Sequence, residues 1–288
     1  MDGRMGDRVD SRMDGTAGDG HEDAPVRLDW RIDGVAQLTL DRPDSLNTLT
    51  DETVACLERR CAEAAAGGAR VVIVTGSGRA FCGGAQITYF TDPRSPFYRD
   101  PLAIRDDYVA PIVRVFRLLR EARFVTVAAI NGFALGGGCE LALSCDFRLM
   151  ADHARIGLPE TRLGVVAGAG GVQLLAHIVG RSRALEIALL GEQWPAAEAL
   201  RVGLVDAVHP ATLLDEAALA FARRFLACSP ISVAETKRAL YRCQSATADE
   251  ADRIALDAVA AAASGSDWWE GTAAFAEKRV PGYRREDR

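Results

Sequence analysis

The chain has almost no lysine and no long apolar run, and these absences help to exclude certain classes of protein. Lys237 and Lys278 are the only lysines, and the formal net charge of −6 argues against a broad nucleic-acid surface. No apolar run is long enough to span a bilayer, and the first 24 residues lack the apolar core of a signal peptide. We therefore expect a soluble, cytoplasmic protein without nucleic-acid or membrane partners.

Metal and nucleotide motifs are also missing. The seven cysteines include no C-x-x-C pair and the four histidines are dispersed, so no metal site is expected and the thiols should be reduced and mostly buried. A Cys–His catalytic pair stays open as a less favoured alternative. Gly76-Ser77-Gly78 follows a predicted strand, but Phe81 stands where a dinucleotide fingerprint requires its last glycine. There is no P-loop and no Gly-x-Ser-x-Gly nucleophile elbow.

Composition and periodicity divide the chain into three parts. Residues 1–25 are acidic and poor in apolar side chains, which predicts a disordered tail. Strand and helix signals follow, including a strand over 35–40 and a helix over 51–66 capped by Thr50. After a segment at 88–111 that we expect to be mobile, the chain becomes mostly helical. We predict an α/β core over 26–210 and a helical subdomain over 211–288.

The most informative stretch covers residues 125–171. An apolar strand pattern leads into Asn131-Gly132 and then Gly136-Gly137-Gly138, after which a helical pattern carries Glu140 in its first turn. Glycines let a ligand approach the backbone, and the first amides of a helix have no internal partner. A second carboxylate, Glu160, follows in Leu158-Pro159-Glu160, and residues 168–171 form another glycine-rich helix entry.

A second glycine-rich strand exit lies at Gly83-Gly84. Taken singly, a glycine run is usually a turn and a glutamate near a helix start is usually a favourable dipole contact. Two such exits that converge, however, supply the two N–H groups that an oxyanion hole needs.

These residues resemble the enoyl-CoA hydratase/isomerase (crotonase) superfamily over nearly the whole chain except the tail. The resemblance rests on five motifs in order: Ala80-Phe81-Cys82-Gly83-Gly84-Ala85, residues 131–141, Leu158-Pro159-Glu160 with the glycines at 164–171, residues 198–205, and Phe275-Ala276-Glu277-Lys278-Arg279.

The resemblance implies a spiral of ββα units with a C-terminal helical trimerisation region, assembled as a homotrimer or a dimer of trimers. It implies an acyl-CoA thioester as ligand, with no cofactor beyond the CoA of the substrate. By position, the oxyanion-hole amides would belong to Ala85 and Gly137, and the acid/base pair would be Glu140 and Glu160. The implied CoA-binding residues are Leu46, Ala85, Gln86, Ile87 and Gly137, with Phe275 and Lys278 reaching the CoA of a neighbouring subunit.

The implied reaction is syn addition of water across the 2,3 double bond of a 2-enoyl-CoA, or the reverse dehydration. Two fixed N–H donors stabilise the enolate oxygen, Glu140 takes a proton from water, and Glu160 delivers one to the α-carbon. An isomerase or another acyl-CoA lyase or hydrolase on the same scaffold is the first alternative, and a non-catalytic CoA- or RNA-binding protein is the second. Two departures point to an unusual acyl group or to local changes only: Gln86 replaces the usual aspartate, and the interval from Ala85 to Asn131 is long.

Overall fold

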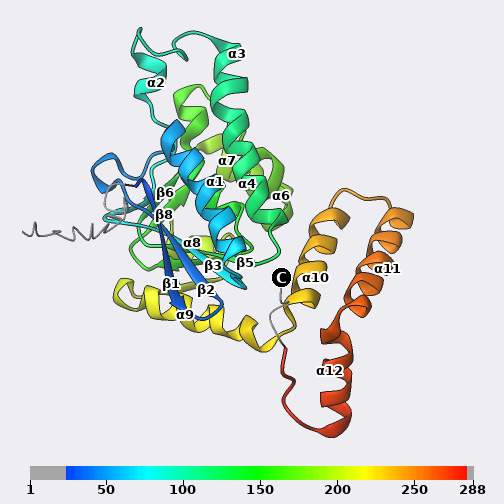
Figure 1. Ribbon diagram of the computed structural model, residues 1–288. Coiled ribbons are helices and arrows are strands. Elements are labelled where there is room, and N and C mark those ends of the chain that lie inside the picture. The colour runs from blue at the N-terminus through cyan, green and yellow to red at the C-terminus, as the bar shows by residue number, and fades with distance from the viewer. Residues whose placement is uncertain (1–23, 284–288) are drawn as a thin grey trace, which may run out of the picture.

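Two sheets form the centre of the computed structural model, which describes residues 24–283 (Figure 1). The larger sheet has the order β1-β2-β3-β5-β7-β10, and the smaller one has the order β4-β6-β8-β9. Pairing is antiparallel between β1 and β2 and between β8 and β9, and parallel elsewhere. The strand bounds are β1 Val26–Ile32, β2 Val35–Leu40, β3 Val71–Gly76, β4 Ala80–Cys82, β5 Val125–Ile130, β6 Phe133–Leu135, β7 Phe147–Ala151, β8 Arg155–Gly157, β9 Trp194–Pro195 and β10 Ala207–His209.

The chain alternates between these two sheets in a series of repeated units. Each turn places one strand in the large sheet and the next in the small sheet, as in β3–β4, β5–β6 and β7–β8, and then continues into a helix. The strands β3 and β5 read as nearly continuous apolar runs because both faces are covered. This arrangement confirms the predicted spiral of ββα units. It also brings the ends of β4 and β6 side by side, which positions the candidate site.

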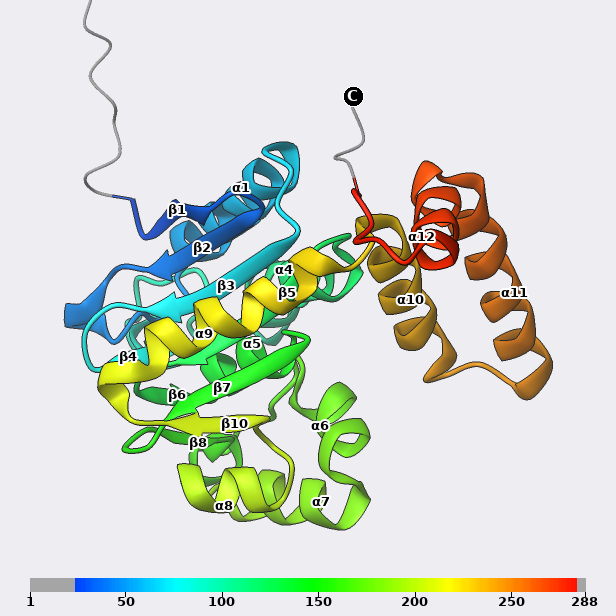
Figure 2. The ribbon, with the colours of Figure 1, turned by 90° about the horizontal axis from the view of Figure 1, so that it is seen from below.

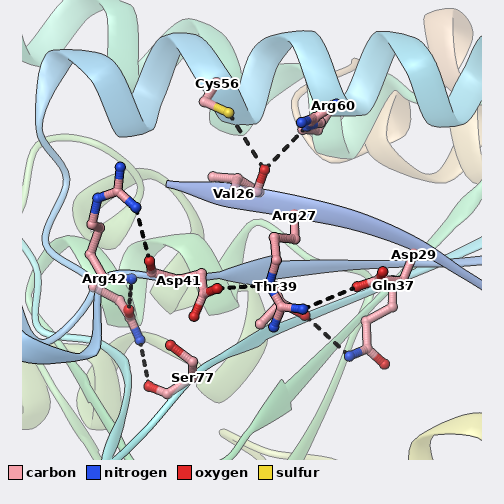
Figure 3. Close-up of polar contacts among 11 residues, drawn as sticks. Val26, Arg27, Asp29, Gln37, Thr39, Asp41, Arg42, Cys56, Arg60 and Ser77 are labelled. Atoms are coloured by element: carbon pink, nitrogen blue, oxygen red, sulfur yellow. Dashed lines mark hydrogen bonds and ion pairs between the residues drawn. The ribbon is translucent and has the colours of Figure 1, made fainter. Parts of the chain in front are cut away.

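The N-terminal hairpin is fastened to the first long helix, α1 (Asp51–Ala66). The Val26 carbonyl accepts a hydrogen bond from Arg60 Nε at 3.1 Å and a weaker one from Cys56 Sγ at 3.6 Å (Figure 3). Arg27 on β1 pairs with Asp41 just beyond β2, with Nε and Oδ2 2.7 Å apart. These contacts hold the end of the hairpin, from which the chain enters the loop at residues 42–50.

Local signals explain α1 and β2. The Thr50 hydroxyl accepts from the Thr53 amide at 3.1 Å, so the helix begins where its cap predicts. Val54, Leu57 and Cys61 are buried along one face, as the spacing predicts. The strand predicted over 35–40 is β2 itself.

The segment 88–111 is folded rather than a plain loop. It contains α2 (Thr88–Thr91), α3 (Pro101–Ala103) and a π-helix over Ile104–Val109 that runs directly into α4 (Ala110–Glu121). Phe97 and Tyr108 are buried and pack against Tyr89, with Phe90 also packing on Tyr108. Burial of these aromatic side chains gives the segment defined secondary structure, and its mobility stays a prediction.

The remaining helices divide between the core and an arm. The core carries α5 Gly137–Leu143, α6 Gly171–Val179, α7 Arg181–Leu190, α8 Ala196–Arg201 and α9 Leu214–Arg223. Figure 2 shows α9 lying across the large sheet, whereas α10 (Pro230–Cys243), α11 (Ala248–Ser264) and α12 (Ser266–Glu277) project away from it. The trimerisation role of the C-terminal helices stays a prediction, and residues 1–23 of the expected tail lie outside the described residues.

Helix length and hydropathy give no single membrane-crossing helix within residues 24–283. One bent pair of segments, Ala211–Ala227 and Pro230–Cys243, meets the length and composition criteria together, but the two meet at 105°.

Candidate active site

The two predicted oxyanion-hole amides lie next to each other. A β-carbon placed on Gly137 would be 3.8 Å from the Ala85 nitrogen, and one placed on Gly84 would be 3.1 Å from the Gly137 nitrogen. Gly137 is the first residue of α5, so helix geometry leaves its N–H without an internal acceptor. Gly84 and Gly136 have φ of +93° and +54°, a region that favours glycine. The glycines thus let two strand exits approach within van der Waals distance.

Glu140 is buried one helical turn into α5. Its Oε1 accepts the amide of Ala169 at 2.8 Å and that of Gly171 at 2.9 Å. Burial raises the pKa of this carboxyl, and the hydrogen bonds from Gly171, Ala169 and Gly170 oppose the rise.

Glu160 lies on a short 3-10 helix, Pro159–Leu163. Its Oε1 would be 2.8 Å from a β-carbon on Gly136, so the carboxyl contacts the start of α5. Its Oε2 is buried and makes no hydrogen bond within the described residues. Burial, with a smaller contribution from the nearby Glu140 charge, raises the pKa of Glu160 to about 7. The two predicted carboxylates are therefore neighbours with different environments.

The raised pKa of Glu160 predicts a pH-dependent stability. A carboxyl whose pKa is about 7 when folded, against the ordinary 4.5, binds its proton more tightly in the folded state. Its contribution to the free energy of unfolding is therefore complete below pH 4.5 and is lost as the pH rises through 7. As the pH is raised from 5.5 to 8.5, we expect Glu160→Gln to gain stability relative to wild type, because glutamine does not ionise and wild type loses the remaining contribution of the protonated Glu160.

Urea unfolding of both proteins at the two pH values measures this difference. Glu198→Gln, at an exposed position on α8, is the matched control. Its free energy of unfolding should change with pH by the same amount as that of wild type. An equal pH dependence in wild type and Glu160→Gln would contradict the prediction.

Three of the predicted CoA-binding residues border the same strand exits. Leu46 has φ +57°, and its carbonyl accepts the Gly83 amide at 2.7 Å. The Gln86 side chain is engaged locally: its Oε1 accepts from the Thr48 hydroxyl at 2.7 Å, and its Nε2 donates to the Thr88 hydroxyl at 2.9 Å. Ile87 is 52% exposed. Of the two interpretations of Gln86, this geometry favours a local hydrogen-bond role.

Within a single chain, the predicted CoA contacts Phe275 and Lys278 do not lie at the site. Phe275 is 87% exposed on α12, and Lys278 ends that helix in a left-handed conformation. In both ribbon views α12 lies in the projecting arm, away from β6 and β8 (Figures 1 and 2). Their predicted contact with the CoA of a neighbouring subunit stays a prediction.

Two positioning features are not predicted from the sequence. Asn47, 1% exposed with φ +56°, accepts the Arg42 amide and donates to the carbonyls of Ser77 and Ala80, which joins the loop before α1 to β4. Asparagine tolerates this backbone region, and that preference is the only local signal. The second feature is the contact between Glu140 and the glycine-rich entry at 168–171, where the amides of Ala169 and Gly171 donate to the carboxylate.

No group of three or more metal-binding side chains occurs within residues 24–283. Five cysteines are buried, as expected, whereas Cys228 is exposed and Cys243 is partly buried. A groove of about 1160 Å³ lies elsewhere, between the end of α1 and the start of α10, and none of the candidate residues lines it.

Comparison with known proteins gives the class to which this fold and site belong. The family model described as enoyl-CoA hydratase/isomerase matches residues 31–286. The chain is 36% identical to crotonyl-CoA hydratase of Syntrophomonas wolfei, covering 85% of this chain and 92% of that protein. It is 34% identical to 2,3-dehydroadipyl-CoA hydratase of Escherichia coli, covering 87% and 95%.

Solved structures agree. An enoyl-CoA hydratase from Bacillus anthracis superimposes with a TM-score of 0.83 at 33% identity, covering 91% of this chain and all of that one. This chain belongs to the enoyl-CoA hydratase/isomerase family and has the crotonase fold. Both the predicted resemblance and the predicted fold class are confirmed.

Proposed function

We propose that this chain is an enoyl-CoA hydratase that adds water syn across the 2,3 double bond of a 2-enoyl-CoA, or catalyses the reverse dehydration. The observation that carries the proposal is the pairing of the buried Glu140 with the half-buried Glu160 beside two adjacent backbone amides. Hydration needs both elements, because water must lose a proton, the α-carbon must gain one, and the thioester oxygen becomes negative in between.

The environments of the two carboxylates suggest their roles. Burial raises the pKa of Glu140, but the amide hydrogen bonds on its Oε1 oppose that rise, which suits this residue to take the proton from water. The pKa of Glu160 is raised to about 7, so near neutral pH a large share of the molecules holds a proton on it for delivery to the α-carbon. The amides of Ala85 and Gly137 bind the enolate oxygen. No metal or redox step enters this scheme, and CoA comes with the substrate.

Assembly and location belong to the same proposal. We infer a homotrimer or a dimer of trimers in the cytoplasm, in which α12 of one subunit brings Phe275 and Lys278 to the CoA of the next. The high exposure of Phe275 within one chain supports a contact with a second copy.

Turnover of a panel of 2-enoyl-CoA thioesters tests the reaction, from crotonyl-CoA to longer and aromatic members. We expect loss of the conjugated-thioester absorbance together with the mass of one added water. A shift of the double bond without added water would instead indicate an isomerase. Saturable binding of CoA with no change in any thioester would favour a non-catalytic protein.

A further inference from the structure

The residue that carries one oxyanion-hole amide, Ala85, pairs with Leu49 through a single isolated bridge. The Leu49 amide donates to the Gly84 carbonyl at 2.8 Å. Because a trans peptide is planar, the Gly84 carbonyl and the Ala85 N–H point in opposite directions within one plane. The hydrogen bond from Leu49 therefore fixes the Gly84–Ala85 peptide with the Ala85 N–H pointing away from Leu49.

The peptide on the other side of Ala85 is held indirectly. The Gln86 N–H donates to the Tyr108 hydroxyl oxygen at 3.2 Å, and that hydroxyl donates to the Leu49 carbonyl at 2.8 Å. The phenol thus stands between two backbone groups, one from each side of the bridge. Both peptides that flank Ala85 are fixed to Leu49, one directly and one through Tyr108.

The Tyr108 side chain is itself well fixed. It is 3% exposed, and its ring centroid lies 5.3–5.7 Å from those of Tyr89, Phe90 and Phe97. It belongs to the π-helix Ile104–Val109, a form that occurs often at functional positions. Burial raises the pKa of the phenol, so the hydroxyl keeps the proton that it donates to Leu49.

We propose that Tyr108 is a positioning residue for the oxyanion hole, whose hydroxyl sets the orientation of the Ala85 amide by bridging Gln86 and Leu49. This inference rests on the proposed function, because only in the proposed reaction does the Ala85 N–H donate a hydrogen bond to the oxygen of a bound thioester. It also gives the long interval between Ala85 and Asn131 a role, because the π-helix lies within this interval. Packing alone would require only the ring, whereas the bridge requires the hydroxyl.

Tyr108→Phe separates the two roles, since it keeps the ring and removes only the hydroxyl. The probe is butyryl-CoA labelled with ¹³C at the thioester carbonyl, a saturated ligand that cannot be hydrated. In wild type we expect the bound carbonyl to show a downfield ¹³C shift and a lowered stretching frequency, because two N–H donors polarise it. In Tyr108→Phe we expect about half of this change to disappear. Tyr89→Phe removes a hydroxyl from the same aromatic cluster and should keep the full change.

Kinetics give a second readout. We expect kcat for crotonyl-CoA to fall about tenfold in Tyr108→Phe with little change in KM, a smaller loss than the ~10²–10³ for outright removal of an oxyanion donor. If Tyr108→Phe does not fold, Gln86 can be replaced by its α-hydroxy acid. This removes the same hydrogen bond by exchanging the backbone N–H for an ester oxygen, and it should reproduce the reduced carbonyl change.

The outcomes are distinguishable. A wild-type protein that binds butyryl-CoA without any carbonyl change would overturn the proposed oxyanion hole, and the role of Tyr108 with it. A full carbonyl change in wild type that persists in Tyr108→Phe, or in the ester variant, would overturn the role of Tyr108 alone. Loss of the change in Tyr89→Phe as well would show that the cluster acts through packing, and would also overturn the inference.

Discussion

Replacing either Glu140 or Glu160 by glutamine is expected to lower kcat for crotonyl-CoA hydration by about 10²–10⁴-fold, the usual contribution of a positioned acid or base. Glutamine is nearly isosteric with glutamate, so the pocket keeps its shape while the group loses its ability to transfer a proton. KM should change less than kcat, since the backbone amides that we propose to bind the thioester oxygen remain in place. The measurement is the steady-state loss of the conjugated-thioester absorbance, with Glu198→Gln as the exposed control.

The two variants should differ in their pH profiles. In the proposed reaction the Glu160 carboxyl, with a pKa of about 7, acts in its protonated form as the acid for hydration, so wild-type activity should decline as the pH rises through that value. In Glu160→Gln the residual activity should lose this decline, whereas Glu140→Gln should retain it. Activity of either variant within a few fold of wild type would remove that residue from the reaction.

Replacing Lys237 by methionine should produce the largest change in stability. The Lys237 ammonium, 8% exposed, uses all three of its protons, on the Leu119 carbonyl at 2.9 Å, the Phe124 carbonyl at 2.8 Å and Asp146 Oδ2 at 2.7 Å. Methionine fills a similar volume but leaves the Asp146 carboxylate without its cation. Removing one partner of a buried ion pair typically costs about 3–5 kcal/mol of unfolding free energy.

Denaturant unfolding at a fixed protein concentration measures the loss. Lys278→Met is the matched control, because Lys278 is the only other lysine and is exposed, and it should leave the unfolding midpoint nearly unchanged. The double variant Lys237→Met with Asp146→Asn should recover part of the loss, since the uncompensated charge is then gone. A loss below about 1 kcal/mol in Lys237→Met would show that water reaches Asp146 and replaces the ammonium.

The parts of this protein that the sequence predicts well are those with local causes. Thr50 caps α1, and the alternation over 35–40 gives β2, because a cap and a two-residue period act within a few residues. Glu140 and Gly137 are predicted in the same way, from a strand, a glycine turn and a helix start in one short stretch. Family motifs then supply the roles that local patterns do not specify.

The parts that escape prediction depend on pairs far apart in the chain. Nothing near Glu140 indicates that the amides of Ala169 and Gly171 bind it, because that contact forms only when α5 and the start of α6 pack together. Tyr108 lies in a segment rich in proline and charge that gives no periodic signal, and its hydroxyl contacts residues 22 and 59 positions away. Such contacts follow from the spiral rather than from any local pattern.

The near absence of lysine has a practical consequence for studying assembly. One of the two lysines is enclosed between α10 and the core, so amine-directed reagents should modify Lys278 as the sole accessible side-chain amine. A dye attached there sits at the end of α12 without any engineered substitution. Energy transfer between labelled copies then reports directly on how the arms of neighbouring molecules approach one another.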